Sequence, residues 1–182
     1  MELKTAIGLI EGDHFDGKAP EVWADLGCGA GLFSYALAHL LPAGSAVIAV
    51  DRSPAALESH PNPKQATISQ KQFDFENDEW QLPPLDGILM ANSLHFVRNK
   101  AAFLPKIRAG IKEDGRVVIV EYETDVPNPW VPYPLRFESL KALLEQTGFA
   151  EVQHLREHPS RYGRAHIYAA VAGIQRMTHS RQ

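Results

Sequence analysis

The chain has 182 residues, which is enough for one domain with a full core and too few for a separate substrate domain beside a nucleotide-binding core. Its net charge of −4 shows no global basic field, which argues against a nucleic-acid partner and favours a small-molecule substrate. The single cysteine, Cys28, excludes an internal disulfide and a cysteine-cluster metal site, and no metal is expected.

Residues 1–15 lack the apolar core of a secretory signal. Charged residues at Glu2, Lys4, Glu11 and Asp13 interrupt the apolar positions there. No apolar run in the chain approaches the roughly 20 residues that are needed to cross a membrane. We therefore expect a cytoplasmic protein with no membrane partner.

Strands and helices are predicted to alternate along the chain. Strands are predicted from short apolar runs, and helices from apolar residues repeated every three or four positions. In chain order they are a helix over 3–10, a strand over 22–26, a helix over 32–41, a strand over 46–51, a short helix from Ser53 to before Pro61, a weak strand within 66–72, a strand over 85–91, a helix over 99–111, a strand over 116–122, a helix over 136–146, and strands over 151–157 and 165–172. The runs over 85–91 and 116–122 do not alternate with polar residues, which is typical of central parallel strands covered on both faces. The last two strands are predicted to form an antiparallel hairpin.

The most informative pattern is a predicted strand that ends in glycines spaced G-x-G-x-G, at Gly27, Gly29 and Gly31. Without Cβ atoms these positions can adopt positive φ and let a ligand approach the backbone closely. The helix that follows presents free N–H groups to an anionic part of that ligand. Asp51, at the end of the next strand, is placed to accept hydrogen bonds from ribose hydroxyls. The pattern predicts a site for an adenosine-containing cofactor, although a purely structural turn would share the glycines.

The glycine spacing separates two classes of cofactor. The dinucleotide fingerprint requires a glycine at position 32, where the chain has Leu32, and a Tyr-x-x-x-Lys pair is absent from the sequence. Both observations argue against an NAD-dependent oxidoreductase. Together with the preceding Trp23-Ala24-Asp25-Leu26, the segment resembles motif I of the class I S-adenosylmethionine-dependent methyltransferases.

The resemblance covers about positions 20–173 and implies one methyltransferase domain over 1–182. The fold it implies is α/β and Rossmann-like, a doubly wound, mostly parallel seven-stranded sheet with an antiparallel C-terminal strand. The cofactor it implies is S-adenosyl-L-methionine. The residues that it assigns to the cofactor are Asp25, Gly27, Cys28, Gly29, Gly31, Asp51, Arg52, Asp74, Phe75 and Asn92.

The side chains after the third and fourth strands have assigned parts in this scheme. Asp74 would offer its carboxylate to the adenine amino group while Phe75 covers the purine face. The alternative is that Asp74 caps its own loop and Phe75 belongs to the core. Asn92 would line the methionine and methyl side. Cys28 fits the turn because its side chain is small. A nucleophilic role is disfavoured, because no histidine lies nearby in sequence to activate the thiol.

His95 is the candidate catalytic residue. It follows the strand over 85–91, at the carboxyl edge of the sheet where ligands of open α/β folds bind. There it would act as a general base or orient the acceptor, and the alternative is a packing or capping role. The Asn/Asp-Pro-Pro-Tyr motif of enzymes that methylate nucleic-acid amino groups is absent, which favours a small-molecule acceptor.

An acceptor pocket and lid are predicted from the end of the strand over 116–122 and the proline-rich loop over 124–134. The candidates are Glu121, Tyr122, Glu123, Trp130 and Tyr133. Their aromatic faces would also favour a cationic sulfonium, although packing on the sheet edge is equally compatible. The N-terminal segment is short for this family, so a second copy of the chain, in a homo-oligomer, is one way to close the acceptor side. The alternative function is a non-catalytic cofactor-binding or scaffold protein with the same fold.

Overall fold

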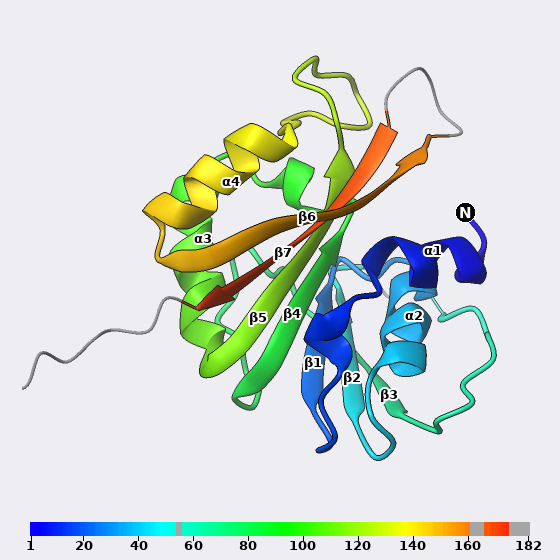
Figure 1. The fold of residues 1–182 in the computed structure, drawn as a ribbon. Coiled ribbons are helices and arrows are strands. Elements are labelled where there is room, and N and C mark those ends of the chain that lie inside the picture. The colour runs from blue at the N-terminus through cyan, green and yellow to red at the C-terminus, as the bar shows by residue number, and fades with distance from the viewer. Residues whose placement is uncertain (54–55, 161–165, 175–182) are drawn as a thin grey trace, which may run out of the picture.

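A seven-stranded sheet runs through the centre of the computed structural model, which describes residues 1–53, 56–160 and 166–174 (Figure 1). The strands are β1 (Val22–Leu26), β2 (Ala46–Asp51), β3 (Thr67–Gln72), β4 (Leu85–Ala91), β5 (Ile111–Tyr122), β6 (Phe149–Pro159) and β7 (His166–Ile174). Their order is β3-β2-β1-β4-β5-β7-β6. β1 to β5 pair in parallel, and β7 pairs antiparallel with both β5 and β6. The predicted mostly parallel sheet with its C-terminal antiparallel pair of strands is confirmed, and positions 161–165 of the predicted hairpin lie outside the described residues.

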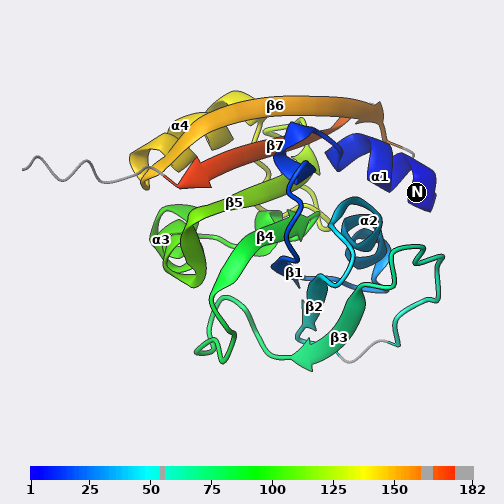
Figure 2. The ribbon, with the colours of Figure 1, turned by 60° about the horizontal axis from the view of Figure 1, so that its bottom comes forward.

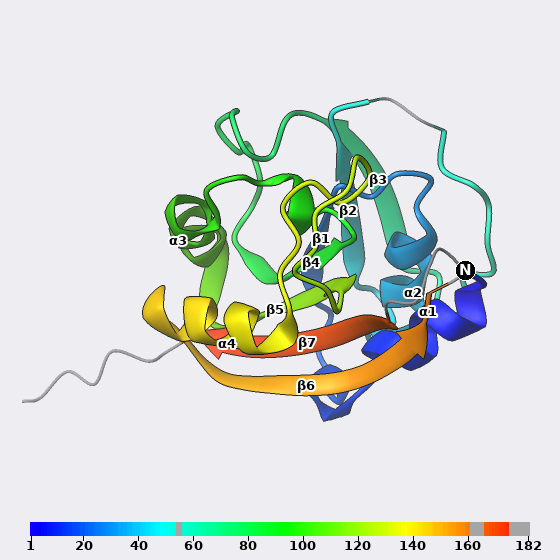
Figure 3. The same cartoon turned by 90° about the horizontal axis from the view of Figure 1, so that it is seen from above.

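Helices cover both faces of this sheet (Figures 2 and 3). They are α1 (Leu3–Ile10), α2 (Leu32–Leu40), α3 (Lys100–Gly110) and α4 (Phe137–Gln146), with short 3₁₀ helices η1 (Asp13–Phe15) and η2 (Leu94–Phe96). Successive side chains of a strand point to opposite faces. Ile88 and Met90 of β4 accordingly pack in the cluster that contains α3 and α4, whereas Leu89 packs with α1 and α2. No described helix is long and apolar enough to cross a membrane.

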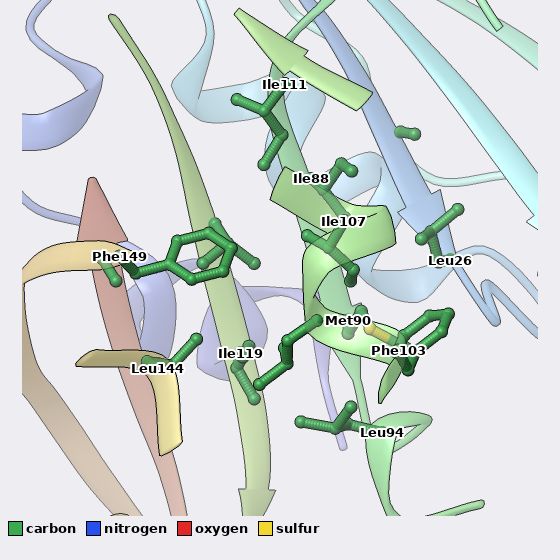
Figure 4. Close-up of a cluster of buried hydrophobic side chains, with 14 of the residues drawn as sticks. Leu26, Ile88, Met90, Leu94, Phe103, Ile107, Ile111, Ile119, Leu144 and Phe149 are labelled. Atoms are coloured by element: carbon green, nitrogen blue, oxygen red, sulfur yellow. The ribbon is translucent and has the colours of Figure 1, made fainter. Parts of the chain in front are cut away.

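The face under α3 and α4 is filled by a cluster of buried apolar side chains (Figure 4). α3 contributes Phe103 and Ile107, and α4 contributes Leu144. The sheet contributes Met90 from β4 and Ile119 from β5. Burying one side chain of this size contributes about 1.5–3 kcal/mol. The cluster therefore holds α3 against the strands whose carboxyl ends carry the polar residues described below.

The helix predicted to begin at Ser53 is wrong over residues 56–60, which have no regular structure. Positions 54 and 55 of that prediction lie outside the described residues. The Glu58 N–H donates to the carbonyl of Ala30 at 2.9 Å, so this segment is tied to the glycine turn instead. A helix of about two turns is marginal on its own, and here a tertiary hydrogen bond competes with it.

β5 begins five residues earlier than the predicted strand, at Ile111. The residues just before the predicted strand, Asp114 and Gly115 among them, belong to β5 in the structure. The pairing with β4 shifts register at this point, from Leu85 opposite Ile111 to Gly87 opposite Arg116. The irregularity lies within these added residues of β5, and α3 leads directly into the strand.

Candidate active site

A cavity of about 320 Å³ lies at the carboxyl edge of the sheet. Figure 3 shows the molecule from above. The wall of the cavity includes residues that follow four different strands: Gly27 after β1, Asp51 at the end of β2, Asp74 after β3 and Asn92 after β4. The strand order changes direction between β1 and β4, and ligands of open α/β sheets bind at such a point. The volume is at the lower end of the range for small-molecule sites, about 300–1,000 Å³.

Six of the ten residues predicted to bind the cofactor line this cavity: Gly27, Asp51, Arg52, Asp74, Phe75 and Asn92. The other four, Asp25, Cys28, Gly29 and Gly31, belong to the end of β1 and the turn after it, but they do not line the cavity. The structure therefore brings residues from separate loops to one wall and places the rest of the motif behind it.

The glycine turn depends on the absence of side chains. Gly27, Gly29 and Gly31 have φ values of +83°, +52° and +89°, which are in the left-handed region. A Cβ atom on Gly27 would lie 2.5 Å from the Cβ of Ser93, so the close approach of β1 and β4 requires glycine there. The Gly27 N–H donates to the carbonyl of Val50 at 2.8 Å, which ties the turn to β2.

Asp51 is oriented by backbone donors. One carboxylate oxygen accepts a hydrogen bond from the Gly29 N–H at 3.0 Å, and the other accepts one from the Ser53 N–H at 2.9 Å. A carboxylate has about four acceptor sites, so each oxygen can still accept a further donor. The side chain is only partly buried and lines the cavity, so a ligand can reach it.

Behind the turn lie two buried groups with raised pKa values. Burial, followed by the charge of Asp51, raises the pKa of Asp25 to about 7, although the Ser34 hydroxyl donates to its Oδ2 at 2.6 Å. Its Oδ1 has no hydrogen-bond partner within the part of the chain that is described. Burial and the same two carboxylates raise the pKa of Cys28 to about 12. The thiol is therefore protonated at neutral pH, which argues against a nucleophilic role.

The loop after β3 combines both alternatives that were considered for Asp74. Its Oδ1 accepts hydrogen bonds from the N–H groups of Glu76 and Asn77, at 2.9 and 3.2 Å. The Asn77 side chain donates to Oδ2 at 3.0 Å and is the main cause of a lowered Asp74 pKa. Asp74 thus caps its own loop and also lines the cavity. Phe75 likewise lines the cavity while its ring packs 5.7 Å from that of Phe103.

His95 forms a buried pair with Glu121. Its Nδ1 lies 2.7 Å from one carboxylate oxygen, and its backbone N–H donates to the other at 3.0 Å. The two residues are 3% and 1% exposed. Because a carboxylate only accepts hydrogen bonds, the pairing places a proton on Nδ1 and leaves the Nε2 lone pair of a neutral ring available.

This pairing was missed by sequence reasoning, which named both residues without connecting them. The signal was present in the predicted strand arrangement. β4 and β5 are parallel neighbours, with Ala91 opposite Val120. Residues just beyond these two positions therefore meet at the same edge of the sheet.

The proline-rich loop after β5, at the top of Figure 1, is anchored at both ends. At its start, the Phe137 N–H donates to Glu123 Oε2 at 3.0 Å. At its end, the Tyr133 N–H donates to the carbonyl of His95 at 3.0 Å, and the buried Lys100 donates to the carbonyl of Tyr133 at 2.7 Å. Between the anchors, Trp130 is 83% exposed. The loop thus has fixed ends and an aromatic side chain in solvent.

The cavity fits a cofactor that carries several donor groups. Its wall contains carboxylates and Asn92, whose side-chain oxygen is buried and has no hydrogen-bond partner among the described residues. S-adenosylmethionine has an ammonium group, ribose hydroxyls and an adenine amino group that can donate to such acceptors. The Cβ-free surface at Gly27 provides the close backbone approach. Groups of side chains that could hold a metal ion are absent from the described part of the chain.

Comparison with known families identifies the kind of domain that carries this site. A family model described as a methyltransferase domain matches residues 24–117, just over half of the chain. The match includes the glycine turn, Asp51 and the segment that carries His95. No curated protein sequence matches the chain significantly.

Solved structures share the fold at low sequence identity. The 1,6-didemethyltoxoflavin N1-methyltransferase of Burkholderia thailandensis, solved with its substrate and S-adenosylhomocysteine, has a TM-score of 0.68 at 20% identity, over 96% of this chain and 78% of that chain. YcgJ of Bacillus subtilis has a TM-score of 0.68 at 13% identity, over 96% and 99%. Phosphoethanolamine N-methyltransferase 2 of Haemonchus contortus, with phosphomonomethylethanolamine and S-adenosylhomocysteine, has a TM-score of 0.69 at 12% identity, over 96% and 53%. With the family model matching its motif-bearing half, the chain belongs to the methyltransferase domain family and is a class I enzyme that uses S-adenosylmethionine.

Proposed function

We propose that the enzyme methylates a small-molecule acceptor whose nucleophilic atom is oriented and deprotonated by His95. The observation that carries this proposal is the buried His95–Glu121 pair beside the cofactor cavity. Phe96, the next residue, lines that cavity, and so does Asn92 at the end of β4. His95 does not line the cavity itself, but its neighbour in sequence does. The carboxylate of Glu121 fixes the orientation of its ring.

Different residues around the cavity bind different parts of the cofactor. Asp51 accepts hydrogen bonds from the ribose, and the loop of Asp74 and Phe75 takes the adenine. The backbone at Gly27 and the oxygen of Asn92 face the methionine part. When bound, the cofactor supplies a methyl group already activated on a sulfonium, so the protein mainly has to position the acceptor.

An oxygen or nitrogen acceptor loses a proton as it attacks the methyl group. The His95–Glu121 pair removes this proton. Nε2 accepts this proton, and the carboxylate of Glu121 stabilises the imidazolium that results. Burial of the pair keeps water away from it, which strengthens the interaction between the two charges. A positioned base of this kind contributes about 10²–10⁴-fold to a rate.

A small acceptor agrees with the aromatic side chains on the loop of His95 and on the loop that is anchored to it. Phe96, Trp130 and Tyr133 are large apolar side chains that are 52%, 83% and 39% exposed, and they come from the loops after β4 and β5. Aromatic walls with few polar groups are typical of small-molecule sites. The Burkholderia and Haemonchus enzymes were each solved with a small molecule besides S-adenosylhomocysteine, 1,6-didemethyltoxoflavin and phosphomonomethylethanolamine respectively.

The test is a panel of small-molecule acceptors, with formation of S-adenosylhomocysteine as the readout. For an acceptor that is turned over, His95→Gln should lower kcat by about 10²–10⁴-fold and leave the Kd for S-adenosylhomocysteine unchanged. His158→Gln, on the edge strand β6, is the matched control and should retain the wild-type rate. Wild-type kcat in His95→Gln would overturn the role of His95. Failure of the whole panel, with S-adenosylmethionine still bound, would contradict the proposal of a small-molecule acceptor.

A further inference from the structure

Lys106 of α3 directs its ammonium group at one loop of the cofactor cavity. Its Nζ donates to the backbone carbonyls of Phe75 at 3.0 Å, Glu76 at 3.2 Å and Asp78 at 2.6 Å. A lysine ammonium has three donors, and here each has a carbonyl acceptor. α3 lies beside the segment between β3 and β4 (Figure 3). The side chain thus joins a helix of the core to the loop that lines the cavity.

Trp80 contacts both the loop and Lys106. Its indole N–H donates to the carbonyl of Phe75 at 2.9 Å, and Lys106 Nζ lies 5.2 Å from the centre of its ring. The ring also packs 6.4 Å from that of Phe103. A Cβ on Gly110 would lie 3.0 Å from the same ring, so glycine makes room for it at the end of α3.

The loop is closed internally by different contacts. The Asp74 N–H donates to Asp78 Oδ2 at 2.8 Å, and the Asp78 N–H returns a bond to the Asp74 carbonyl at 2.9 Å. These contacts maintain the shape of the loop but do not fix where it lies. Within the described ranges, the hydrogen bonds from this loop to α3 are all made by Lys106.

From this geometry we infer that Lys106 is a positioning residue for recognition of the adenine ring. It holds the loop so that the Asp74 carboxylate and the Phe75 ring face the cavity at a fixed distance from Asp51. Without the ammonium, three carbonyls lose a charged donor and the loop moves relative to β2. The contacts to adenine then weaken, whereas those of the glycine turn and Asp51 to the rest of the cofactor remain.

The test compares two ligands that differ only in the purine. S-inosylhomocysteine carries an oxygen where S-adenosylhomocysteine has the exocyclic amino group. Lys106→Met keeps the aliphatic stem over Trp80 and removes the donors. Calorimetry should show about tenfold weaker binding of S-adenosylhomocysteine by this variant, with a smaller loss for the inosyl ligand, so that the preference between them falls.

Two further variants make the result specific to the donors of Lys106. Lys106→Arg keeps a charged donor and should restore most of the preference. Lys141→Met, on α4, is the matched control and should bind both ligands as the wild type does. An equal loss for both ligands in Lys106→Met would mean a general structural defect and overturn the proposal. So would unchanged binding, or a wild type that does not distinguish the two ligands.

Discussion

The cofactor side and the proposed acceptor side of the site are formed by different kinds of groups. The cofactor side consists mainly of backbone groups and short acidic side chains, arranged by a glycine turn in which Gly27 touches Ser93. The proposed acceptor side consists of side chains, a buried His95–Glu121 pair and exposed aromatic rings on an anchored loop. A ligand shared by a whole family can be bound by backbone, which every sequence has. Selection of one acceptor requires particular side chains.

The comparison predicts the largest effect for a change on the acceptor side that spares the cofactor. In Glu121→Gln, the amide nitrogen faces His95 Nδ1 as a donor, so the ring shifts its proton to Nε2 and loses its free lone pair there. We expect kcat to fall by about 10²–10⁴-fold. Steady-state kinetics and ¹⁵N NMR of the ring nitrogens would check this, and an unchanged tautomer would contradict the explanation.

A change in the backbone of the turn should have the opposite signature. Gly27→Ala places a Cβ 2.5 Å from that of Ser93 at a φ of +83°, so the turn must move. Binding of S-adenosylhomocysteine should weaken by about 100-fold, the equivalent of roughly 2.7 kcal/mol. Gly29→Ala is the matched control, because its Cβ would have no neighbour within 4 Å and only the strain at φ +52° remains. Equal losses of affinity in the two variants would show that steric contact with β4 is not the reason.

The buried carboxyl behind the turn makes the cofactor side sensitive to pH. The pKa of Asp25 is about 7 in the folded protein and lies near 3.8 when the group is unperturbed, so the folded state binds the proton more tightly. Stability is therefore lost as pH rises between these values. Asp25→Asn should remove about 1–4 kcal/mol of that decline, measured by urea unfolding at pH 4.5 and 8.

The sign of this effect can be checked at a second carboxyl. Asp74 has a lowered pKa, so its contribution to stability is present at neutral pH and is lost as the pH falls through the folded-state value. Asp74→Asn should flatten the acid side of the curve and leave the decline toward pH 7 intact. A steeper decline between pH 4.5 and 8 in Asp25→Asn would contradict the burial of an ionisable group there.

The smallest change in stability is expected at the tip of the acceptor loop. Trp130 is 83% exposed, so Trp130→Ala should alter the free energy of unfolding by less than about 0.5 kcal/mol. The acceptor KM should rise severalfold while the Kd for S-adenosylhomocysteine stays constant. Val131→Ala, at a neighbouring position that is 6% exposed, should instead cost about 1 kcal/mol or more of stability. A changed cofactor Kd in Trp130→Ala would break the division between the two sides.

The glycine turn and the place of Asp51 beside it could be predicted from the sequence because their signals are local. The strand, the glycine turn and Asp51 all lie within residues 22–51. Each has a recognisable sequence signal: an apolar run, spaced glycines and an acidic residue at the end of the next strand. The acceptor side was predicted only as a set of residues, since the His95–Glu121 pair spans 26 positions. Lys106 reaches Phe75 across 31 positions, and a lysine in a predicted helix carries no sign of such a contact. The short helix after Ser53 failed because a hydrogen bond to Ala30 outweighed local propensity.

The anchored loop after β5 also matters to anyone who wishes to change what this enzyme methylates. The stretch between Glu123 and Tyr133 is held at its two ends by hydrogen bonds that involve a neighbouring backbone N–H or carbonyl group. Its exposed interior can therefore be exchanged as a cassette, provided that Glu123, Lys100 and the buried Val131 are kept. Libraries confined to that cassette would vary the acceptor range while the machinery for the methyl donor is inherited unchanged.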